Sequence, residues 1–452
     1  MRRVADQNDF ATARMFPLLM KMAAPAVAAQ TVNMLYGLVD RVFIGHIAGT
    51  GATALAGVGV CNTIILIISA FAQFVGGGGA PLTSIELGRG NQEGARRLFG
   101  NGVTLLLVFA AVLMGVTYLF MDPMLRAVGA SDATLPYARD YLAVYVLGTV
   151  FVMITVGLNP FINVAGRPVT AMMSVVIGAA LNIALDPLLI FTFGMGVRGA
   201  AVATVISQGV SAAWIVRFFA HGPKTLRLSR DILGLQRKPL RKILSLGVSP
   251  FVMASTEGII GLVMNASLSG YGDIYVSTLT VMQSSMMICS VPLTGYTTGV
   301  TPVVSYNYGR RDMGRVRQAF KIIFATTTSV TFGLTLWMIL CPGLFARLFT
   351  PDAELIASVE RIMPVFLPGM LLFGMQRACQ TMFVALNEPR ISLFIALFRK
   401  IILLVPLALV LPNFLGVMGI YLAEPIADAT AAITCTVIFV RHYRGTLWGR
   451  SR

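Results

Sequence analysis

The sequence contains few charged residues. Asp, Glu, Lys and Arg make up 12% of its 452 residues, whereas apolar residues make up 56%. Globular domains carry about a quarter charged residues. A water-soluble protein of this size could not hide so much apolar surface, because part of every fold must face water. The composition therefore excludes a soluble globular protein and indicates a chain that lies in a lipid bilayer.

Histidine and paired cysteine are also scarce. The three histidines are scattered, and none of the five cysteines forms a Cys-x-x-Cys pair. Zinc sites need clustered ligands, and isolated cysteines in apolar runs are usually small buried side chains. We therefore expect no cofactor, no disulfide and no metal centre. A membrane-embedded enzyme would need metal ligands or a nucleophile with its base, and the sequence shows neither arrangement.

Apolar runs follow one another along the whole chain. Residues 103–120 and 326–340, for example, contain no charge. Runs of about 18 or more such residues form helices that cross a bilayer. We predict twelve transmembrane helices, at 17–43, 55–84, 98–120, 138–160, 170–193, 200–220, 243–268, 275–303, 319–341, 361–386, 391–411 and 418–440.

The sequence contains an internal repeat, in which the second half is a copy of the first. A shift of 221 residues superposes 76–90 on 297–311 and Pro168 on Pro389, and a shift of 220 carries Gly196 onto Gly416. Repeated hydrophobic bundles are typical of secondary transporters, which bind their substrate between the repeats. The predicted fold is an all-α membrane protein with two six-helix repeats around a central cleft. The predicted parts are an N-lobe (1–220), a basic cytoplasmic linker (221–242) and a C-lobe (243–452).

Basic residues set the expected orientation. The formal net charge is +16, and most Lys and Arg lie in the segments expected on one side of the membrane. Basic loops stay in the cytoplasm, so both termini are expected there, and the excess needs no nucleic-acid partner. Because each repeat has an even number of helices, both halves enter the bilayer in the same direction.

Two carboxylates in the first half are the strongest candidates for function. Asn33, Tyr36 and Asp40 share one face of the first helix, and Asn182 lies one turn before Asp186 in the fifth. Burying a charge in lipid costs at least about 2.5–3.5 kcal/mol. Two carboxylates that meet in a dry cavity could share a proton or hold a Na⁺. The alternative is that both carboxylates lie at helix ends and have a structural role only.

The second half carries its own buried acids. Glu257 lies well inside the seventh helix. Glu424 and Asp428 share a face of the twelfth, and this i, i+4 spacing repels if both are ionised. Arg399 and Lys400 in the eleventh helix are candidate partners. The sequence does not separate a structural ion pair from a working site here.

Three further groups have a predicted role. Gly76–Gly79 lies inside a membrane segment without a following Gly-Lys-Ser/Thr, which favours close helix packing over phosphate binding. Pro25 removes a backbone hydrogen bond within the first helix and is the candidate hinge. Met286 and Met287, with Gln283 beside them, are candidates to line a cavity that accepts varied ligands.

The motifs taken together resemble the multidrug and toxic compound extrusion (MATE) family along nearly the whole chain. No single piece would suffice, but all occur in the family's order. The matching pieces are Val39–Gly45, Gly79–Ser84, Leu87–Asn91, Leu181–Pro187, Thr301–Gly309 and Ala423–Asp428.

The resemblance implies an antiporter that exports organic cations or amphiphiles in exchange for H⁺ or Na⁺ by alternating access. The positions that match the family's coupling site are Asp40, Tyr36, Asn182, Asp186 and Thr204. One branch also uses carboxylates on helices 7 and 10. Glu257 lies near the first, but no Asp or Glu occurs between Arg361 and Glu388, which argues against a Na⁺ site in the C-lobe.

The expected protein is a monomer in the plasma membrane that binds small amphiphilic molecules. The candidates for the substrate cavity are Asn33, Glu257, Gln283, Met286, Met287 and Arg399. A flippase for lipid-linked sugars, from the same wider superfamily, is the main alternative. Such a flippase needs a strongly basic cavity, which Arg377, Arg399 and Lys400 could supply.

Overall fold

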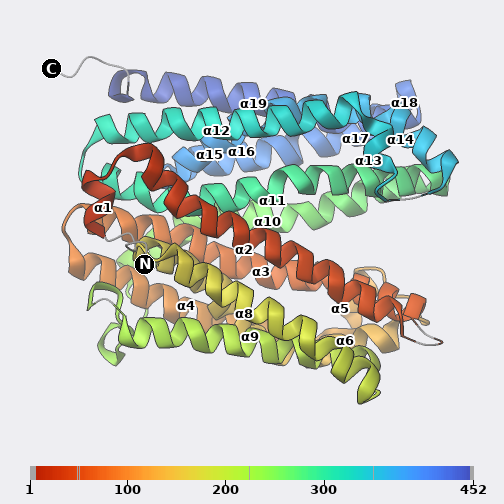
Figure 1. The fold of residues 1–452 in the computed structure, drawn as a ribbon, viewed down its shortest axis with the longest axis horizontal. Coiled ribbons are helices and arrows are strands. Elements are labelled where there is room, and N and C mark those ends of the chain that lie inside the picture. The colour runs from red at the N-terminus through yellow and green to blue at the C-terminus, as the bar shows by residue number, and fades with distance from the viewer. Residues whose placement is uncertain (1–6, 48, 50, 223, 350, 448–452) are drawn as a thin grey trace.

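The computed structural model describes residues 7–47, 49, 51–222, 224–349 and 351–447, and within these ranges it is a bundle of helices without a strand (Figure 1). The principal helices of the first half are α2 (Met15–Gly45), α3 (Gly51–Gly88), α4 (Gln92–Leu119), α6 (Leu135–Leu147), α7 (Thr149–Val164), α8 (Pro168–Pro187) and α9 (Gly196–His221). Those of the second half are α10 (Arg237–Ser269), α11 (Asp273–Gly309), α12 (Met313–Leu340), α14 (Ala353–Phe366), α15 (Phe373–Ala385), α16 (Pro389–Leu397), α17 (Val405–Val410) and α19 (Val417–Leu447).

These helices form the twelve predicted spans. In the described part of the chain, nine stretches are each long and apolar enough to cross a membrane. Two bent pairs, α6 with α7 and α14 with α15, supply one span each. The remaining span, the seventh in chain order, is α10, whose 33 residues pack along α3. At about 1.5 Å per residue this helix is longer than a bilayer core. The all-helical, two-lobed fold is confirmed.

Four spans are less regular than their apolar patterns indicated. The fourth bends by 59° at Gly148, where a side chain would collide with Val205 of α9. The tenth is interrupted by a 3-10 segment that starts at Pro368, because proline cannot donate the helical hydrogen bond. The fifth and eleventh contain π-helical turns at Leu188–Thr192 and Phe398–Leu404. Such turns are frequent at functional sites.

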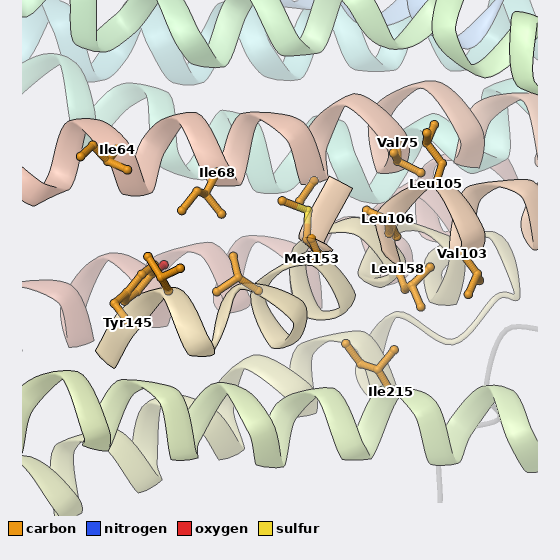
Figure 2. Packing of buried hydrophobic residues seen from close by; sticks show 14 of the residues in the cluster. Ile64, Ile68, Val75, Val103, Leu105, Leu106, Tyr145, Met153, Leu158 and Ile215 are labelled. Atoms are coloured by element: carbon orange, nitrogen blue, oxygen red, sulfur yellow. The ribbon is translucent and has the colours of Figure 1, made fainter. Parts of the chain in front are cut away.

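The apolar core of the first lobe joins α3, α4, α6, α7 and α9. Figure 2 shows Ile68 of α3, Leu106 of α4, Met153 of α7 and Ile215 of α9 within this cluster. All four side chains are buried. Two further clusters fill the second lobe. Each lobe therefore has its own packed interior.

The first turns of α2 and α10 cross between the lobes. Met15, Leu19 and Met22 of α2 belong to a cluster formed mainly by second-half residues. Ile243 and Leu246 of α10 belong to the first-lobe cluster. The repeat shift of 221 carries Met22 onto Ile243, so the exchange is symmetric. The exact boundaries predicted for lobes and linker stay a prediction.

Glycines bring the two lobes together where α2 and α10 begin, at the left of Figure 1. A Cβ on Gly78 of α3 would lie 2.7 Å from the carbonyl oxygen of Ile243, and one on Gly299 of α11 would lie 2.6 Å from that of Met22. The hydroxyl of Ser84 donates to the carbonyl oxygen of Pro302 at 2.7 Å. We call this region the closed end. The predicted close packing at Gly76–Gly79 is confirmed.

Candidate functional site

A polar cavity of about 390 Å³ lies among the helices of the first lobe. Its wall is formed by α2, α3, α7, α8 and α9, with Thr294 and Thr298 of α11 on one side. The polar side chains that reach it include Gln30, Asn33, Tyr36, Gln73, Asn159, Asn182, Thr204 and Gln208. Among the described residues that line this cavity, none carries a charge.

Asp40 and Asp186 meet directly behind this cavity. Asp40 comes from the last third of α2 and Asp186 from the end of α8, and their carboxyl groups lie close enough to interact electrostatically. Asp186 is fully buried, and Asp40 is partly buried. Asn182, which lines the cavity, donates its amide to Asp186 Oδ1 at 3.3 Å. Two carboxylates far apart in sequence thus share one contact network.

The other two predicted members join the same network. Tyr36 lies beside Gln208 of α9, and both line the first-lobe cavity. Thr204 accepts the amide of Asn182 at 3.4 Å and donates its own hydroxyl to the carbonyl oxygen of Ala200 at 3.0 Å. The structure therefore brings together all five residues that the sequence and the family resemblance singled out.

Three oxygens of this network are buried without a hydrogen-bond partner. They are Oδ1 of Asp40, Oδ2 of Asp186 and Oδ1 of Asn182. A buried acceptor that lacks a donor costs free energy, and a buried carboxylate needs a counter-charge. A proton or a small cation that prefers oxygen ligands would satisfy these atoms. These three oxygens are suitable ligands for such an ion.

Sequence reasoning missed two members of the network. Gln208 accepts the hydroxyl of Thr155 at 2.8 Å and lines the same cavity as Tyr36. It lies one helical turn after Thr204, and this spacing could have identified it. Tyr141 of α6 is buried close to Thr204 and Asp40. No pattern in the sequence distinguishes it from an ordinary core tyrosine, because its role depends on how α6 packs against α9.

A larger cavity, of about 580 Å³, lies in the second lobe. Of the predicted substrate-cavity residues, Gln283, Met286, Met287 and Arg399 line it. Asn33 lines the first-lobe cavity instead, because it lies on the face of α2 that packs toward α8. Glu257 belongs to α10, but its side chain is outside the described part of the structure. Arg41, the neighbour of Asp40 in sequence, points to this second cavity.

Four charged side chains form a buried network at the wall of the second cavity. Arg399 Nε is 2.5 Å from Asp428 Oδ1, and its Nη2 is 3.6 Å from Glu424 Oε1. Lys400 Nζ is 3.4 Å from the same oxygen of Glu424. The guanidinium also stacks on Phe373, 4.9 Å from the ring centre. The predicted pairing of Glu424 and Asp428 with Arg399 and Lys400 is confirmed.

A third cavity, of about 380 Å³, lies between the lobes toward the closed end. Leu66 of α3 and Thr294 of α11 line all three cavities. Gln73 is shared with the first-lobe cavity, and Met253 and Arg377 are shared with the second. The cavities therefore adjoin one another along the interface of the lobes and form the central cleft.

Two repeated six-helix lobes around a polar cleft at membrane depth define a secondary transporter. A family model described as MatE matches residues 25–188 and 251–410. The chain therefore belongs to the MatE family, whose members are multidrug and toxic compound extrusion transporters.

Curated relatives and solved structures agree with this assignment. The chain is 24% identical over 430 residues to the multidrug export protein MepA of Staphylococcus haemolyticus. The match covers 95% of this chain and 94% of the relative. A crystal structure of MATE in the bent conformation has a TM-score of 0.90 at 22% identity and covers 98% of both chains. An outward-facing multidrug resistance MATE transporter of the MOP superfamily has a TM-score of 0.89 at 22% identity, with 98% of this chain and 99% of that one covered.

Proposed function

We propose that this protein is an antiporter that couples inward movement of H⁺ or Na⁺ to export of amphiphilic or cationic small molecules. The observation that carries the proposal is the meeting of Asp40 and Asp186 behind the first-lobe cavity. The family supports the export of drugs, since MepA is a multidrug export protein. The coupling ion and the exchange mechanism rest on the site itself.

The paired carboxylates give a physical reason for coupling. Two ionised carboxylates in contact repel strongly where the dielectric constant is low. A proton or Na⁺ relieves this repulsion, so its binding favours the arrangement of α2, α8 and α9 that closes around it. A ligand shifts a conformational equilibrium only by its difference in affinity for the two states. Cation binding at this site and drug binding in the cleft would then favour opposite states, and the cation gradient drives expulsion.

We infer that both termini and the closed end face the cytoplasm. Basic side chains gather there, as expected for cytoplasmic loops. Lys242 at the start of α10 lies 3.8 Å from Glu86 of α3, and Arg89 lies 2.9 Å from the same carboxylate. This cluster joins the lobes where Ser84 meets Pro302. The conformation described here would then be one in which the cleft is sealed from the inside.

Separate ion gradients test the coupling. The test uses vesicles that contain the purified protein and a fluorescent cationic dye. A pH gradient and a Na⁺ gradient are imposed separately, and we expect one of them to drive dye movement. The ion that drives movement is the coupling ion, because carboxylates with neutral oxygens can hold either. Dye movement that needs no ion gradient, or that follows neither gradient, would exclude cation coupling.

Pro25 offers a second test of the mechanism. It lies inside α2, which continues unbroken from Met15 to Gly45, and it is fifteen residues before Asp40. Replacing it with alanine restores a backbone donor and stiffens the helix. We expect Pro25→Ala to lower efflux while the protein reaches the membrane at the normal level. Pro342→Ala, at the start of the short helix α13 (Pro342–Ala346) and outside the site, would show whether any proline change has this effect.

The flippase alternative depends on a strongly basic cavity. Arg399 and Lys400 do line the second-lobe cavity, but both are ion-paired with Glu424, and Arg399 is also paired with Asp428. Their charges are therefore largely balanced within the wall. Arg41 and Arg377 also line this cavity, so its lining holds more basic than acidic side chains and the flippase stays the second candidate function.

A further inference from the structure

Polar side chains follow the inside of the first lobe from the carboxylate pair toward the closed end. On α7, Thr155, Asn159 and Asn163 are spaced four residues apart, so they share one face of the helix. Ser174 and Asn182 of α8 are eight residues apart and share a face in the same way. All five line the first-lobe cavity. The cavity is therefore a polar passage along these helices, and it extends well beyond the carboxylates.

Helix α9 supplies the third wall of this passage. Thr204, Ser207 and Ser211 lie on it at intervals of three and four residues, and all three line the cavity. The hydroxyl of Ser211 donates to the carbonyl oxygen of Ser174 at 2.8 Å. The amide of Asn159 donates to the hydroxyl of Ser174 at 3.1 Å. These hydrogen bonds hold α7, α8 and α9 together along the passage.

The inner end of the passage lies near the closed end. Asn163 is two residues after Phe161, whose ring packs against Gly79 of α3. Ser84, which contacts the second lobe at the closed end, is five residues after Gly79 on the same helix. Arg167, four residues after Asn163, is exposed. The passage therefore reaches to within about one helical turn of the surface on the side that we assign to the cytoplasm.

Two buried atoms in this passage have no hydrogen-bond partner within the described part of the chain. They are Oγ of Ser207, one turn inward from Thr204, and Oδ1 of Asn163, at the inner end. The two residues are 3% and 2% exposed. A buried polar atom without a partner costs free energy, but one that faces a polar cavity can bind water or a cation. Oxygens that can bind an ion thus continue inward from the carboxylate pair.

Three polar positions of the passage become apolar in the second half of the chain. The shift of 221 applies to Asn163 and Asn182, and the shift of 220 applies to Ser207. The corresponding residues are Val384, Leu403 and Ala427. Small polar residues can simply pack membrane helices together, but that need is the same in both repeats. The polarity is therefore specific to the lobe that holds the carboxylate pair.

We propose that the coupling ion moves between the carboxylate pair and the cytoplasm through this passage, with Ser207 and Asn163 as its oxygen ligands on the way. The inference rests on the proposed cation coupling and adds the route and two residues to it. An ion cannot cross an apolar wall at a small cost, so a polar passage is the favourable way out of the lobe. Neutral oxygens bind an ion weakly enough to release it again. A proton would move along water molecules that the same oxygens can hold.

This route separates the ion from the transported molecule. The first-lobe cavity adjoins the central cleft at Gln73 and Thr294, so the cleft is the competing route for the ion. An ion that leaves past Asn163 does not have to pass a drug molecule in the cleft. The two routes therefore predict different effects of a change at Asn163.

A double variant that copies the second half tests the route. Asn163→Val with Ser207→Ala introduces the residues that the other repeat has at these positions. Vesicles with the purified protein report two rates for ethidium: uptake driven by an ion gradient, and exchange of radiolabelled for unlabelled ethidium without a gradient. Exchange needs only the drug-bound protein to change state. We expect the ion-driven rate to fall about tenfold and the exchange rate to change by less than about twofold.

The outcomes that contradict the proposal are distinct. An equal loss of both rates would give the two residues a structural role only. An unchanged ion-driven rate would place the ion in the central cleft. Asn163→Ser keeps an oxygen at the inner end, so it should retain most of the ion-driven rate. The matched control is Thr331→Val, since Thr331 is fully buried in α12, which supplies none of the described residues that line the three cavities. It should leave both rates unchanged.

Failure of this route can be told apart from failure of the coupling itself. If cation coupling is wrong, ethidium uptake by the unaltered protein follows neither the pH gradient nor the Na⁺ gradient. If coupling is right and the route is wrong, the unaltered protein follows one gradient, and the double variant follows it equally fast.

Discussion

Asp40→Asn is expected to abolish drug efflux without lowering the amount of protein in the membrane. The carboxyl of Asp40 lies close to that of Asp186, and its Oδ1 is buried without a donor. An amide keeps the size of the side chain but cannot be deprotonated or supply a charge for Na⁺. The cation gradient then no longer changes the preferred state. Dye efflux from cells that lack their own drug pumps measures the loss of transport. Immunoblots of membranes check the amount of the variant protein.

The matched control for this variant is Asp132→Asn. Asp132 lies in a loop of the same lobe, pairs with Arg126 at 2.9 Å, and has 89% of its side chain exposed. Exposed ion pairs contribute about 0–1 kcal/mol, so efflux should stay normal. Asp186→Asn should reproduce the Asp40→Asn phenotype because both belong to one network. Full drug resistance in cells that carry Asp40→Asn would refute the coupling site.

Gly309→Ala is expected to stop transport by preventing the lobes from meeting at the closed end. A methyl group on Gly309 of α11 would overlap the backbone carbonyl of Ile85 in α3, and one on Gly88 would overlap that of Tyr306. The obstacle is backbone, which cannot rotate away as a side chain can. Overpacking of this kind costs about 1–3 kcal/mol. An equilibrium between two transport states would shift by roughly 5–150-fold, away from the state described here.

Hydrogen exchange distinguishes a shifted equilibrium from a misfolded protein. In Gly309→Ala and in Gly88→Ala, amides near Ser84 and Pro302 should exchange faster, because the seal that protects them opens. Amides within the core of each lobe should keep their protection. Gly333→Ala is the matched control, since Gly333 is inside helix α12 and nothing lies within 4 Å of an added Cβ. Normal efflux with Gly309→Ala would show that the closed end need not form.

The two lobes of this transporter differ most where the repeat places equivalent residues. Thr204 and Gln208 border a hollow, whereas Glu424 and Asp428 hold Arg399 and Lys400. A symmetric backbone thus supports unequal chemistry. We expect the first lobe to respond to the coupling ion and the second to contact the transported molecule, which would let the two ligands act on opposite states without competing for one carboxylate.

Much of this could be predicted from sequence because lipid imposes simple rules. Every backbone group in the bilayer must be satisfied within a helix, so the apolar runs predicted the spans. Residues one turn apart share a face, so Tyr36 could be grouped with Asp40, and Asn182 with Asp186. The bend at Gly148 was missed, because it depends on contacts between helices rather than on the local apolar pattern, whereas the bend at Pro368 follows from the proline itself.

By itself the sequence determined the membrane class, the duplicated bundle, the family resemblance and the acids worth testing. Only the tertiary structure decided that Asp40 lies near Asp186, that Tyr141 is buried close to them, that Gln208 lines the same cavity as Tyr36, and that Asn33 and Gln283 line different cavities. The physical reason is that hydropathy and helical period fix which face of a helix is polar, whereas the partner of that face depends on how bent helices pack.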